Sequence, residues 1–414
     1  MINRAIRAFK DMIMRPNDPT TQRTNSNLTK AKNAKNDEFY TQYHDIEKEI
    51  NAYLDYDENV FRNKTILLPC DDPEWSNFTK YFAKNFERFG LKKLISTSYA
   101  HNSKQLAVGY TPSLFESNNP QFDQQKTLVK GKIFTLCKDT TQDGRIDIND
   151  LQWTYLEGDG DFRSEEVKAL RDQADMIITN PPFSLFREFL AWIVEGNKQF
   201  VIIGNKNCVT YKEVFPLIKA NKMRSGRTEW SRGMWFETKD ESDVDRVDDG
   251  INMKSVSSVW FTNFEHGRRH QPLQLMTMQD NLRFNKKMKG KTAYDHYDNY
   301  DAIEVPFTDA IPSDYTGVMG VPISFLDKYC PEQFEILGAN QRGCHDDVPD
   351  IKKYDDYWEV RQNGERTGSS GGKTNENTNI AMNDGRKNYF INQDGHIVQS
   401  TYKRIFIKHK DATQ

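Results

Sequence analysis

The feature that most constrains the fold is the stretch 174–189, in which a short apolar run meets two consecutive prolines. Residues 176–178 (Met-Ile-Ile) are too few for a helix core and too apolar for a solvated loop, so they predict one buried parallel strand. Pro181 and Pro182 must end this strand, because neither has a backbone N–H and both fix φ at about −65°. Asn180 is extended because a proline follows it. The sequence therefore predicts a stiff corner at the carboxyl end of a strand, where ligands bind in open α/β sheets.

The corner Asn180-Pro181-Pro182-Phe183 is suited to bind an amino group attached to a heterocycle. The Asn180 side-chain oxygen and the Pro181 carbonyl are two acceptors in fixed relation, and Phe183 offers a ring face beside them. Such an amino nitrogen is a poor nucleophile, and two acceptors that pull on its hydrogens favour the pyramidal form that attacks. This step needs no titrating base. The alternative is an ordinary strand-ending turn, since Asn-Pro and Pro-Pro commonly break strands.

Length and composition set the class of protein. A chain of 414 residues forms one large domain or two. The sequence contains no run of about 18 apolar residues, so no membrane span is predicted. Residues 1–16 are too charged for a secretory signal peptide. Five widely spaced cysteines suit free thiols in a reducing compartment. We therefore expect a soluble, cytoplasmic protein, and because its net charge is −3, any basic surface must be local.

Residues 1–36 form a basic N-terminal arm, with eight Lys or Arg against two acids. Apolar residues recur at helical spacing in residues 1–15, which predicts a short amphipathic helix before a polar segment. The arm is either a tether that binds DNA phosphates or a solvated terminus.

A β-α-β unit follows the arm and carries acids at its first turn. Residues 65–68 and 94–95 predict strands, and residues 75–90 predict the helix between them, with Gly90 as its C-terminal stop. The turn lacks a glycine fingerprint for pyrophosphate, so its carboxylates suit a cationic, phosphate-free cofactor. The turn residues are Cys70, Asp71 and Asp72.

Residues 100–150 are polar and predict an insertion. Within it, residues 139–150 place oxygen-bearing side chains at positions 1, 3, 5, 9 and 12 of a calcium loop, with glycine at position 6. Position 12 is Asp150 and no flanking helix pair is evident, so the alternative is an Asp-Gly hairpin. His266 and His270 have helical i, i+4 spacing, but Arg268 and Arg269 would repel a cation and no catalytic carboxylate accompanies the pair, so no metal is assigned.

The segment after the next strand, residues 153–156, ends in Gly-Asp-Gly-Asp-Phe. This places Asp161 at the carboxyl edge of the sheet, where it can accept from an adenine amino group, with Phe162 beside the ring. The alternative is a polar turn before a helix that begins near Ser164. The other predicted elements are helices at 46–54, 185–194 and 211–220 and strands at 200–203, 258–262 and 402–407.

The order of these segments resembles the amino-methyltransferases that use S-adenosylmethionine in a Rossmann-like α/β fold. More narrowly, the chain resembles the EcoRI-type family of adenine-specific DNA methyltransferases. The resemblance covers about Lys35 to His270, with a further similar segment at 321–338. It rests on KNDEFYTQYHDIE, CDDPEWSNFTKYF, GDGDFRSEE, TNPPFSLFREFL and WFTNFEHGRRH.

This resemblance implies a methyltransferase catalytic domain at 37–265 and a C-terminal target-recognition region at 266–414. Within the latter, residues 363–387 are rich in Gly, Ser, Asn and Thr, which predicts a flexible loop or linker. The resemblance also implies that S-adenosylmethionine is the cofactor and that a flipped-out adenine of double-stranded DNA is methylated at N6. The implied catalytic residues are Asn180, Pro181, Pro182 and Phe183. The implied cofactor-binding residues are Phe39, Tyr40, Thr41, Cys70, Asp71, Asp72, Asp161 and Phe162.

Two departures from the family pattern concern the cofactor. The first turn lacks the FxGxG pattern, and the second strand ends at 96–99 without the acid that usually holds the ribose hydroxyls. Recognition of the bases that flank the target adenine needs basic side chains. The alternative is that most of the candidates below contact phosphates or lie on the solvated surface. The candidates are Arg224, Arg227, Arg232, Arg268, Arg269 and the run 283–291.

The expected setting is a restriction-modification system, with a cognate endonuclease of the same site, or an orphan or phage methylase. The protein is expected to be a monomer or a dimer. One alternative is methylation of RNA adenine or of a protein glutamine, whose side-chain amide also offers two N–H donors. An alternative of another class is a DNA-binding protein without activity.

Overall fold

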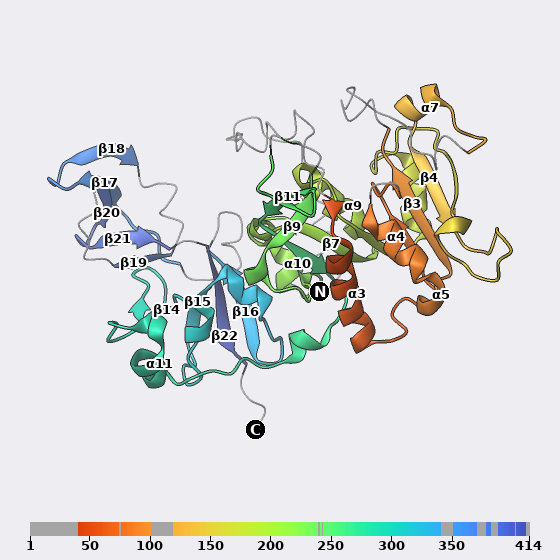
Figure 1. Cartoon of the computed structure of the whole chain (residues 1–414). Helices are drawn as coiled ribbons and strands as arrows, with labels where there is room; N and C mark the ends of the chain where they lie inside the picture. Colours follow the sequence, from red (N-terminus) through yellow and green to blue (C-terminus); the bar gives the residue numbers. More distant parts are fainter. Residues whose placement is uncertain are drawn as a thin grey trace. The chain divides into compact units, whose positions relative to one another are not determined.

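The computed structural model describes residues 40–73, 76–100, 119–238, 241, 243–340, 351–370, 378–381, 388–401 and 403–410. The N-terminal arm and Phe39 lie outside these residues. The chain divides into two compact units (Figure 1). The first unit contains residues up to Lys206 and residues 223–267, and the second contains residues 207–222 and 268–414. The predicted boundary near 265 is close to one of these divisions, but the segment 207–222 belongs with the second unit.

An eight-stranded sheet forms the centre of the first unit, in the order β5-β4-β3-β2-β6-β7-β12-β8. Its four middle strands are parallel to one another, and they are β3 (Lys93–Ser98), β2 (Thr65–Leu68), β6 (Met176–Thr179) and β7 (Gln199–Asn205). The outer strands are antiparallel, and they are β4 (Lys132–Leu136), β5 (Gln152–Tyr155), β12 (Ser258–Thr262) and β8 (Arg224–Ser225). The strand predicted before the two prolines is therefore confirmed as β6, which is buried along its whole length.

The segment 100–150 is only partly an insertion, which corrects the sequence-based expectation. The strand β4 lies inside it and pairs with β3 on one side and β5 on the other (Figure 1). The helix α7 (Gln124–Val129) precedes this strand. Burial alternates along β4, as expected for an outer antiparallel strand. Its apolar residues are few and lie between polar segments, so the sequence pattern does not indicate a strand here.

The helices of the first unit are α3 (Tyr43–Tyr56), α4 (Asn77–Lys84), α5 (Phe86–Phe89), α8 (Glu165–Gln173) and α9 (Phe186–Glu195). The single helix predicted at 75–90 is divided at Asn85, whose φ of −103° and ψ of 13° are not helical. Gly90 ends α5 with a φ of 62°, a left-handed conformation that favours glycine.

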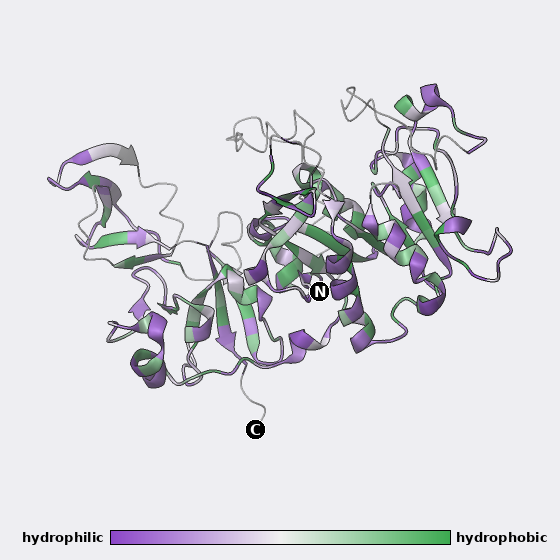
Figure 2. Cartoon of the chain, viewed as in Figure 1, coloured by the Kyte–Doolittle hydropathy of each residue, from purple (hydrophilic) through white to green (hydrophobic). Residues whose placement is uncertain are grey.

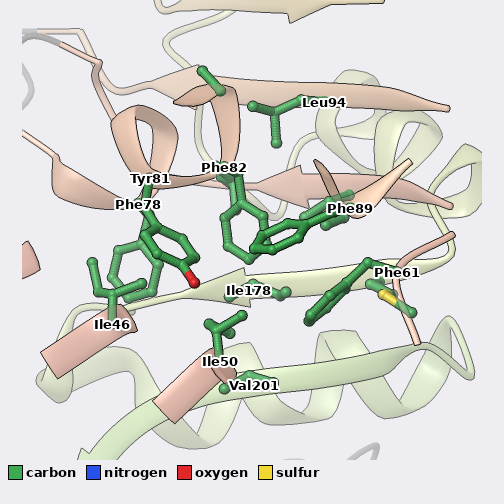
Figure 3. Close-up of a cluster of buried hydrophobic side chains, with 14 of the residues drawn as sticks. Ile46, Ile50, Phe61, Phe78, Tyr81, Phe82, Phe89, Leu94, Ile178 and Val201 are labelled. Carbon is green, nitrogen blue, oxygen red and sulfur yellow. The ribbon is translucent and has the colours of Figure 1, made fainter. Parts of the chain in front are cut away.

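Aromatic side chains fill the space between the first helices and the sheet. Figure 3 shows Phe82, Phe89 and Phe61 beside Ile178 of β6, with Ile50 of α3 in the same cluster. Each of these side chains is at least 97% buried, and burial of one phenylalanine contributes roughly 1.5–3 kcal/mol. This packing fixes the position of β6 and therefore of the corner that follows it.

A buried carboxylate joins α3 to the turn after β8. Glu49 is fully buried and accepts hydrogen bonds from the Tyr53 hydroxyl at 2.6 Å and from the backbone N–H groups of Arg227 at 2.6 Å and Thr228 at 2.8 Å. The Thr228 hydroxyl also donates to it at 2.7 Å. Burial and the neighbouring Glu49 carboxylate raise the pKa of Tyr53 well above its ordinary value.

We expect Glu49→Gln to lower the free energy of unfolding by about 1–3 kcal/mol, because an amide turns an N–H group toward buried N–H donors. Equilibrium unfolding in urea measures this change. The matched control is Glu47→Gln on the exposed face of the same helix, for which a change within about 0.5 kcal/mol is expected. Equal effects of the two substitutions would contradict this role of Glu49.

A smaller four-stranded antiparallel sheet also belongs to the first unit, in the order β1-β9-β11-β10. Its strands are β1 (Tyr40–Thr41), β9 (Met234–Glu237), β11 (Ile251–Val256) and β10 (Arg246–Asp248). The pairing of β1 with β9 brings the start of the described chain next to residues about 195 positions later.

The second unit contains two five-stranded sheets, the short helix α10 (Phe215–Lys219) and α11 (Met278–Phe284). The first sheet consists of β13 (Asp295–His296), β14 (Ala302–Glu304), β15 (Val318–Pro322), β22 (Arg404–His409) and β16 (Phe334–Ala339). The second consists of β18 (Arg366–Ser370), β17 (Tyr357–Arg361), β20 (Asn388–Asn392), β21 (Ile397–Ser400) and β19 (Asn379–Ala381).

Two predictions for the second unit have different outcomes. The strand predicted at 402–407 is confirmed as β22, which lies between β15 and β16. The loop predicted at 363–387 contains the strands β18 and β19, so that prediction is wrong for these residues, and the rest of its residues 371–377 and 382–387 lie outside the described part. Within the described part of the chain, no helix is long and apolar enough to cross a membrane.

Candidate active site

The Asn-Pro-Pro-Phe corner lies at the carboxyl end of β6, as the sequence predicted. Asn180 is half-buried and Pro181 is buried. A short 3₁₀ turn, η4 (Phe183–Leu185), follows the prolines and leads directly into α9. The Thr179 hydroxyl donates to the Pro69 carbonyl at 2.8 Å, so the corner is tied to the end of the neighbouring strand β2.

The acidic turn after β2 bends toward β3. Cys70 has a φ of 63°, which is unusual for a residue with a side chain, and the Asp71 N–H donates to the Thr97 carbonyl at 2.7 Å. The Asp71 side chain is 4% exposed, and its Oδ1 accepts from the hydroxyl of Ser76, the N-cap residue of α4. Its Oδ2 accepts no hydrogen bond from any residue that the structure describes.

The environment of Asp71 changes its acidity. Burial is the largest effect and raises the pKa of Asp71, the hydroxyls of Ser76 and Thr179 lower it, the neighbouring Asp72 carboxylate raises it, and the resulting pKa is about 7. A buried carboxylate oxygen without a donor is costly when ionised. A cation placed beside Oδ2 would favour the ionised form, so this turn fits a positively charged cofactor.

The strand β1 joins the acidic turn to the corner. Thr41 pairs with Phe236 of β9, and its carbonyl accepts from the Asn77 side chain of α4 at 2.9 Å. The Phe236 ring makes an edge-to-face contact with Phe183, with ring centroids 6.2 Å apart. Phe236 is therefore a common neighbour of two predicted residues, since its backbone pairs with Thr41 and its ring contacts Phe183.

Sequence reasoning missed three residues that assemble this site. Ser76 and Asn77 had a local signal, since a serine just before an apolar helical pattern is a typical N-cap. Phe236 had none, because only the tertiary pairing of β9 with β1 brings it beside the corner.

The Gly-Asp-Gly-Asp segment packs against the end of β3. The Ala100 N–H donates to the Asp159 carbonyl at 2.8 Å. Gly160 has a φ of 86°, and a Cβ atom there would collide with the carbonyl of Ser98. This close approach explains why glycine is required at position 160. It also places the following Asp161 beside the end of β3.

Asp161 and Phe162 have different environments. Burial raises the pKa of Asp161, but hydrogen bonds from Arg163 outweigh it, and the pKa lies below its ordinary value. Phe162 is 3% exposed and packs against Phe189 and Trp192 of α9. The structure thus places Phe162 in the core, which corrects the prediction that its ring lies beside a ligand.

Two of the five arginines predicted to contact DNA are buried, and a third is held in an ion pair. Arg224 is 8% exposed, forms an ion pair with Glu265 and donates to the Phe264 carbonyl. Arg268 forms an ion pair with Asp327 at 3.0 Å, and Arg269 is 6% exposed.

Arg269 donates to Asn221 and lies over the Tyr329 ring. The predictions for the buried Arg224 and Arg269 are therefore corrected, whereas Arg268 is half-buried and its contact with DNA stays a prediction. The sequence does not distinguish a buried arginine from an exposed one. Arg227 is half-buried and Arg232 is exposed, and their contact with DNA stays a prediction.

The loop 139–150 is closed by its own backbone. Asp150 accepts from the N–H groups of Thr140, Thr141 and Asp147 at 2.7–3.0 Å, and Asp139 accepts from two further N–H groups of the loop. These hydrogen bonds, the one from Asp147 first, hold the pKa of Asp150 well below its ordinary range. In the described ranges, no group of three or more potential ligand side chains could hold a metal ion.

We expect Asp150→Asn to lower the urea midpoint of unfolding, because the substitution removes a charged acceptor of backbone N–H groups. The control is Asp143→Asn in the same loop, where the exposed carboxylate accepts a hydrogen bond from the N–H of Arg145 and from no other residue that the structure describes. Millimolar Ca²⁺ is expected to leave the melting temperature of the wild type unchanged relative to EDTA. A calcium-dependent rise that Asp150→Asn abolishes would establish a calcium loop instead.

The Asn-Pro-Pro-Phe corner and the acidic turn lie side by side at the carboxyl ends of the central strands β6 and β2. Together they define a site suited to an amino group and a cationic cofactor. Comparison with known proteins agrees with this class. The chain belongs to the family of EcoRI adenine-specific methyltransferases, whose family model matches residues 27–410. The resemblance stated from the sequence is therefore confirmed, and the chain is an adenine-specific methyltransferase.

Three relatives cover most of the chain. It is 41% identical over 321 residues to the Type II methyltransferase M.EcoRI of Escherichia coli, which covers 76% of this chain and 89% of the relative. It is 32% identical to the Type II methyltransferase M.MpnI of Mycoplasma pneumoniae, over 78% of this chain and 94% of the relative. It is 33% identical to the Type II methyltransferase M.MgeORF184P of Mycoplasma genitalium, over 75% and 85%. No solved structure matches the chain significantly.

Proposed function

We propose that the protein transfers the methyl group of S-adenosylmethionine to N6 of an adenine in double-stranded DNA. The observation that carries this proposal is the Asn-Pro-Pro-Phe corner held between the acidic turn and the Thr41–Phe236 pair. The family is adenine-specific, and the relatives are named Type II methyltransferases, which are modification enzymes of restriction-modification systems.

The residues around the acidic turn would hold the cofactor in a Rossmann-like arrangement of β3, β2, β6 and β7. S-adenosylmethionine, when bound, supplies an electrophilic methyl group on a positively charged sulfur. Asp71 offers a buried carboxylate oxygen to that charge, and Tyr40 and Thr41 line the same edge through β1. Cys70, Asp72 and Asp161 remain proposed contacts. Phe39 lies outside the described residues.

The corner would act on the acceptor amine. The Asn180 side-chain oxygen and the Pro181 carbonyl accept the two N6–H groups, which draws the nitrogen lone pair out of the ring and directs it to the methyl carbon. With the cofactor bound, one N–C bond would form as one C–S bond breaks, and the proton that N6 then loses would pass to solvent. No side chain in this scheme has to titrate, so Asn180 acts by position and by its dipole.

Phe183 would stabilise the extruded base. Removing a base from the duplex costs a few kcal/mol, and stacking on an aromatic side chain returns about 1–3 kcal/mol. Phe183 is half-buried, and the fully buried Phe236 fixes its ring by an edge-to-face contact. A ring already held in place loses little further entropy when the base stacks on it.

The same proposal covers the roles of the two units, the location of the enzyme and its partners. The first unit is the catalytic domain and the second unit takes the place of the expected C-terminal target-recognition region. The enzyme works in the cytoplasm, as a monomer or dimer, and a restriction endonuclease of the same site is its expected companion. The basic N-terminal arm would add phosphate contacts.

The test is transfer of a tritiated methyl group from S-adenosylmethionine to duplex DNA, followed by digestion to nucleosides and mass spectrometry. Label in N6-methyldeoxyadenosine is the expected result. Parallel reactions with RNA and with a glutamine-containing protein extract test the alternative acceptors. Label confined to RNA or protein, or no label in the presence of bound cofactor, would overturn the proposal.

A further inference from the structure

The second unit carries a basic and aromatic surface that has no part in the site described above. We name it the 283–291 surface, and it consists of residues 283–291 together with Phe307. Residues 283–291 contain five basic side chains and no acid, whereas the whole chain has a net charge of −3. The basic residues are Arg283, Lys286, Lys287, Lys289 and Lys291.

Buried anchors hold the backbone of this surface in place. The helix α11 ends at Phe284, and the 3₁₀ turn η8 (Lys286–Met288) follows it. Asn281 and Met288 are fully buried, and the Asn285 side chain caps the turn and donates to the Asp309 carbonyl at 3.2 Å. The five basic positions 283, 286, 287, 289 and 291 are exposed, so the surface displays its cations to solvent. The hydrophilic residues of α11 are interrupted by hydrophobic ones (Figure 2).

Two phenylalanines are exposed on the same surface. Phe284 is 61% exposed and Phe307 is 38% exposed. The guanidinium of Arg283 lies over the Phe284 ring at 5.0 Å, and the ammonium of Lys287 lies over the Phe307 ring at 5.3 Å. An exposed apolar side chain that is held beside cations marks an interaction surface rather than a packing defect.

Not all of the positive charge is neutralised within the protein. Lys287 forms an ion pair with Asp309 at 2.9 Å, and Lys291 forms one with Asp295. Among the residues that the structure describes, no carboxylate forms an ion pair with Lys286 or Lys289. These two ammonium groups are therefore available for an external anion.

We propose that the 283–291 surface binds the backbone of duplex DNA, with Lys286 and Lys289 on phosphates and Phe284 against the apolar face of a deoxyribose. Charge complementarity selects this partner, because a concentrated positive surface on an otherwise acidic chain binds a polyanion. Cations interleaved with aromatic rings match the alternation of charged phosphate and apolar sugar. The inference rests on the proposed function, since DNA is the substrate there.

The test is the salt dependence of DNA binding, measured by fluorescence anisotropy with a labelled duplex and the full-length protein. Each phosphate contact adds about 0.9 to the slope of log Kobs against log salt. We expect the double variant Lys286→Ala/Lys289→Ala to reduce this slope by about 1.8 and to weaken binding at least tenfold. Phe284→Ala is expected to weaken binding severalfold and to leave the slope unchanged, because no counterion is displaced by a phenyl ring.

The matched control is Lys92→Ala/Lys138→Ala, which removes two exposed lysines from the first unit and should leave the slope unchanged. Calorimetry with S-adenosylmethionine and circular dichroism verify that each variant is folded. A wild type that methylates DNA while the 286/289 variant keeps the full slope would overturn this inference and leave the proposed function intact. A wild type that neither binds nor methylates DNA would overturn both.

Discussion

Asn180→Ala is expected to lower the rate constant of methyl transfer by about 10²- to 10³-fold, the usual cost of losing one preorganised group that stabilises charge in a transition state. The substitution removes one of the two acceptors that pull on the N6–H groups, and the Pro181 carbonyl remains. Cofactor affinity should change by less than about threefold, because Asp71 and β1 are untouched. Single-turnover reactions with excess enzyme measure the chemical step, and calorimetry measures cofactor binding.

The matched control for this prediction is Asn180→Asp, which keeps an acceptor oxygen at the same place and removes only the amide nitrogen. We expect this variant to retain activity within about tenfold of the wild type, because the acceptor is what the chemistry uses. If alanine and aspartate variants lost activity to the same extent, the amide nitrogen would be the functional atom. If Asn180→Ala transferred methyl at the wild-type rate, the role of the corner would be wrong.

Local sequence patterns predicted the parallel middle of the sheet because β2, β6 and β7 each contain a short apolar run and β3 contains the apolar pair Leu94-Ile95. Such strands are buried on both faces, so their composition is sufficient to identify them. The strand β4 was missed because burial alternates along it and polar segments flank it. The division of the helix predicted at 75–90 into α4 and α5 was also missed, since the aromatic spacing continues across Asn85.

Local sequence patterns also predicted only part of the candidate active site. The strand-ending corner and the acidic turn follow from local chemistry, since proline fixes the backbone and carboxylates follow a strand. The role of Phe236 depends on a pairing between strands far apart in the chain. The burial of Arg224 and Arg269 depends on tertiary partners that composition does not reveal. A residue type predicts what a group can do, and the fold decides whether it faces a ligand.

The second large effect is expected from Asp71→Asn, which should weaken the binding of S-adenosylmethionine about 10- to 100-fold at pH 8. Hydrogen bonds and contacts to charged groups contribute about 1.5–3 kcal/mol each, and the substitution removes the negative charge without changing the size of the side chain. Calorimetric titration measures the affinity. Asp55→Asn, on the exposed part of α3, is the matched control and should leave the affinity unchanged.

The same carboxylate predicts how affinity depends on pH. Burial raises the pKa of Asp71 to about 7, and a cationic cofactor binds the ionised form. Affinity of the wild type should therefore rise between about pH 6 and about pH 8, and affinity of Asp71→Asn should not follow that rise. A pH profile of Asp71→Asn with the same rise as the wild type would show that another group titrates.

In the absence of cofactor, the free energy of unfolding should fall as the pH rises, whereas cofactor affinity should rise. The folded-state pKa of Asp71 lies above its unfolded value of about 3.9, so the folded protein binds the extra proton between about pH 4 and about pH 7. The stability that the neutral carboxyl contributes is lost as the pH rises through about 7. At pH 8 the Asp71→Asn protein should then resist urea better than the wild type while it binds cofactor more weakly. A merely structural carboxylate would not separate these two measurements, because its removal would lower both.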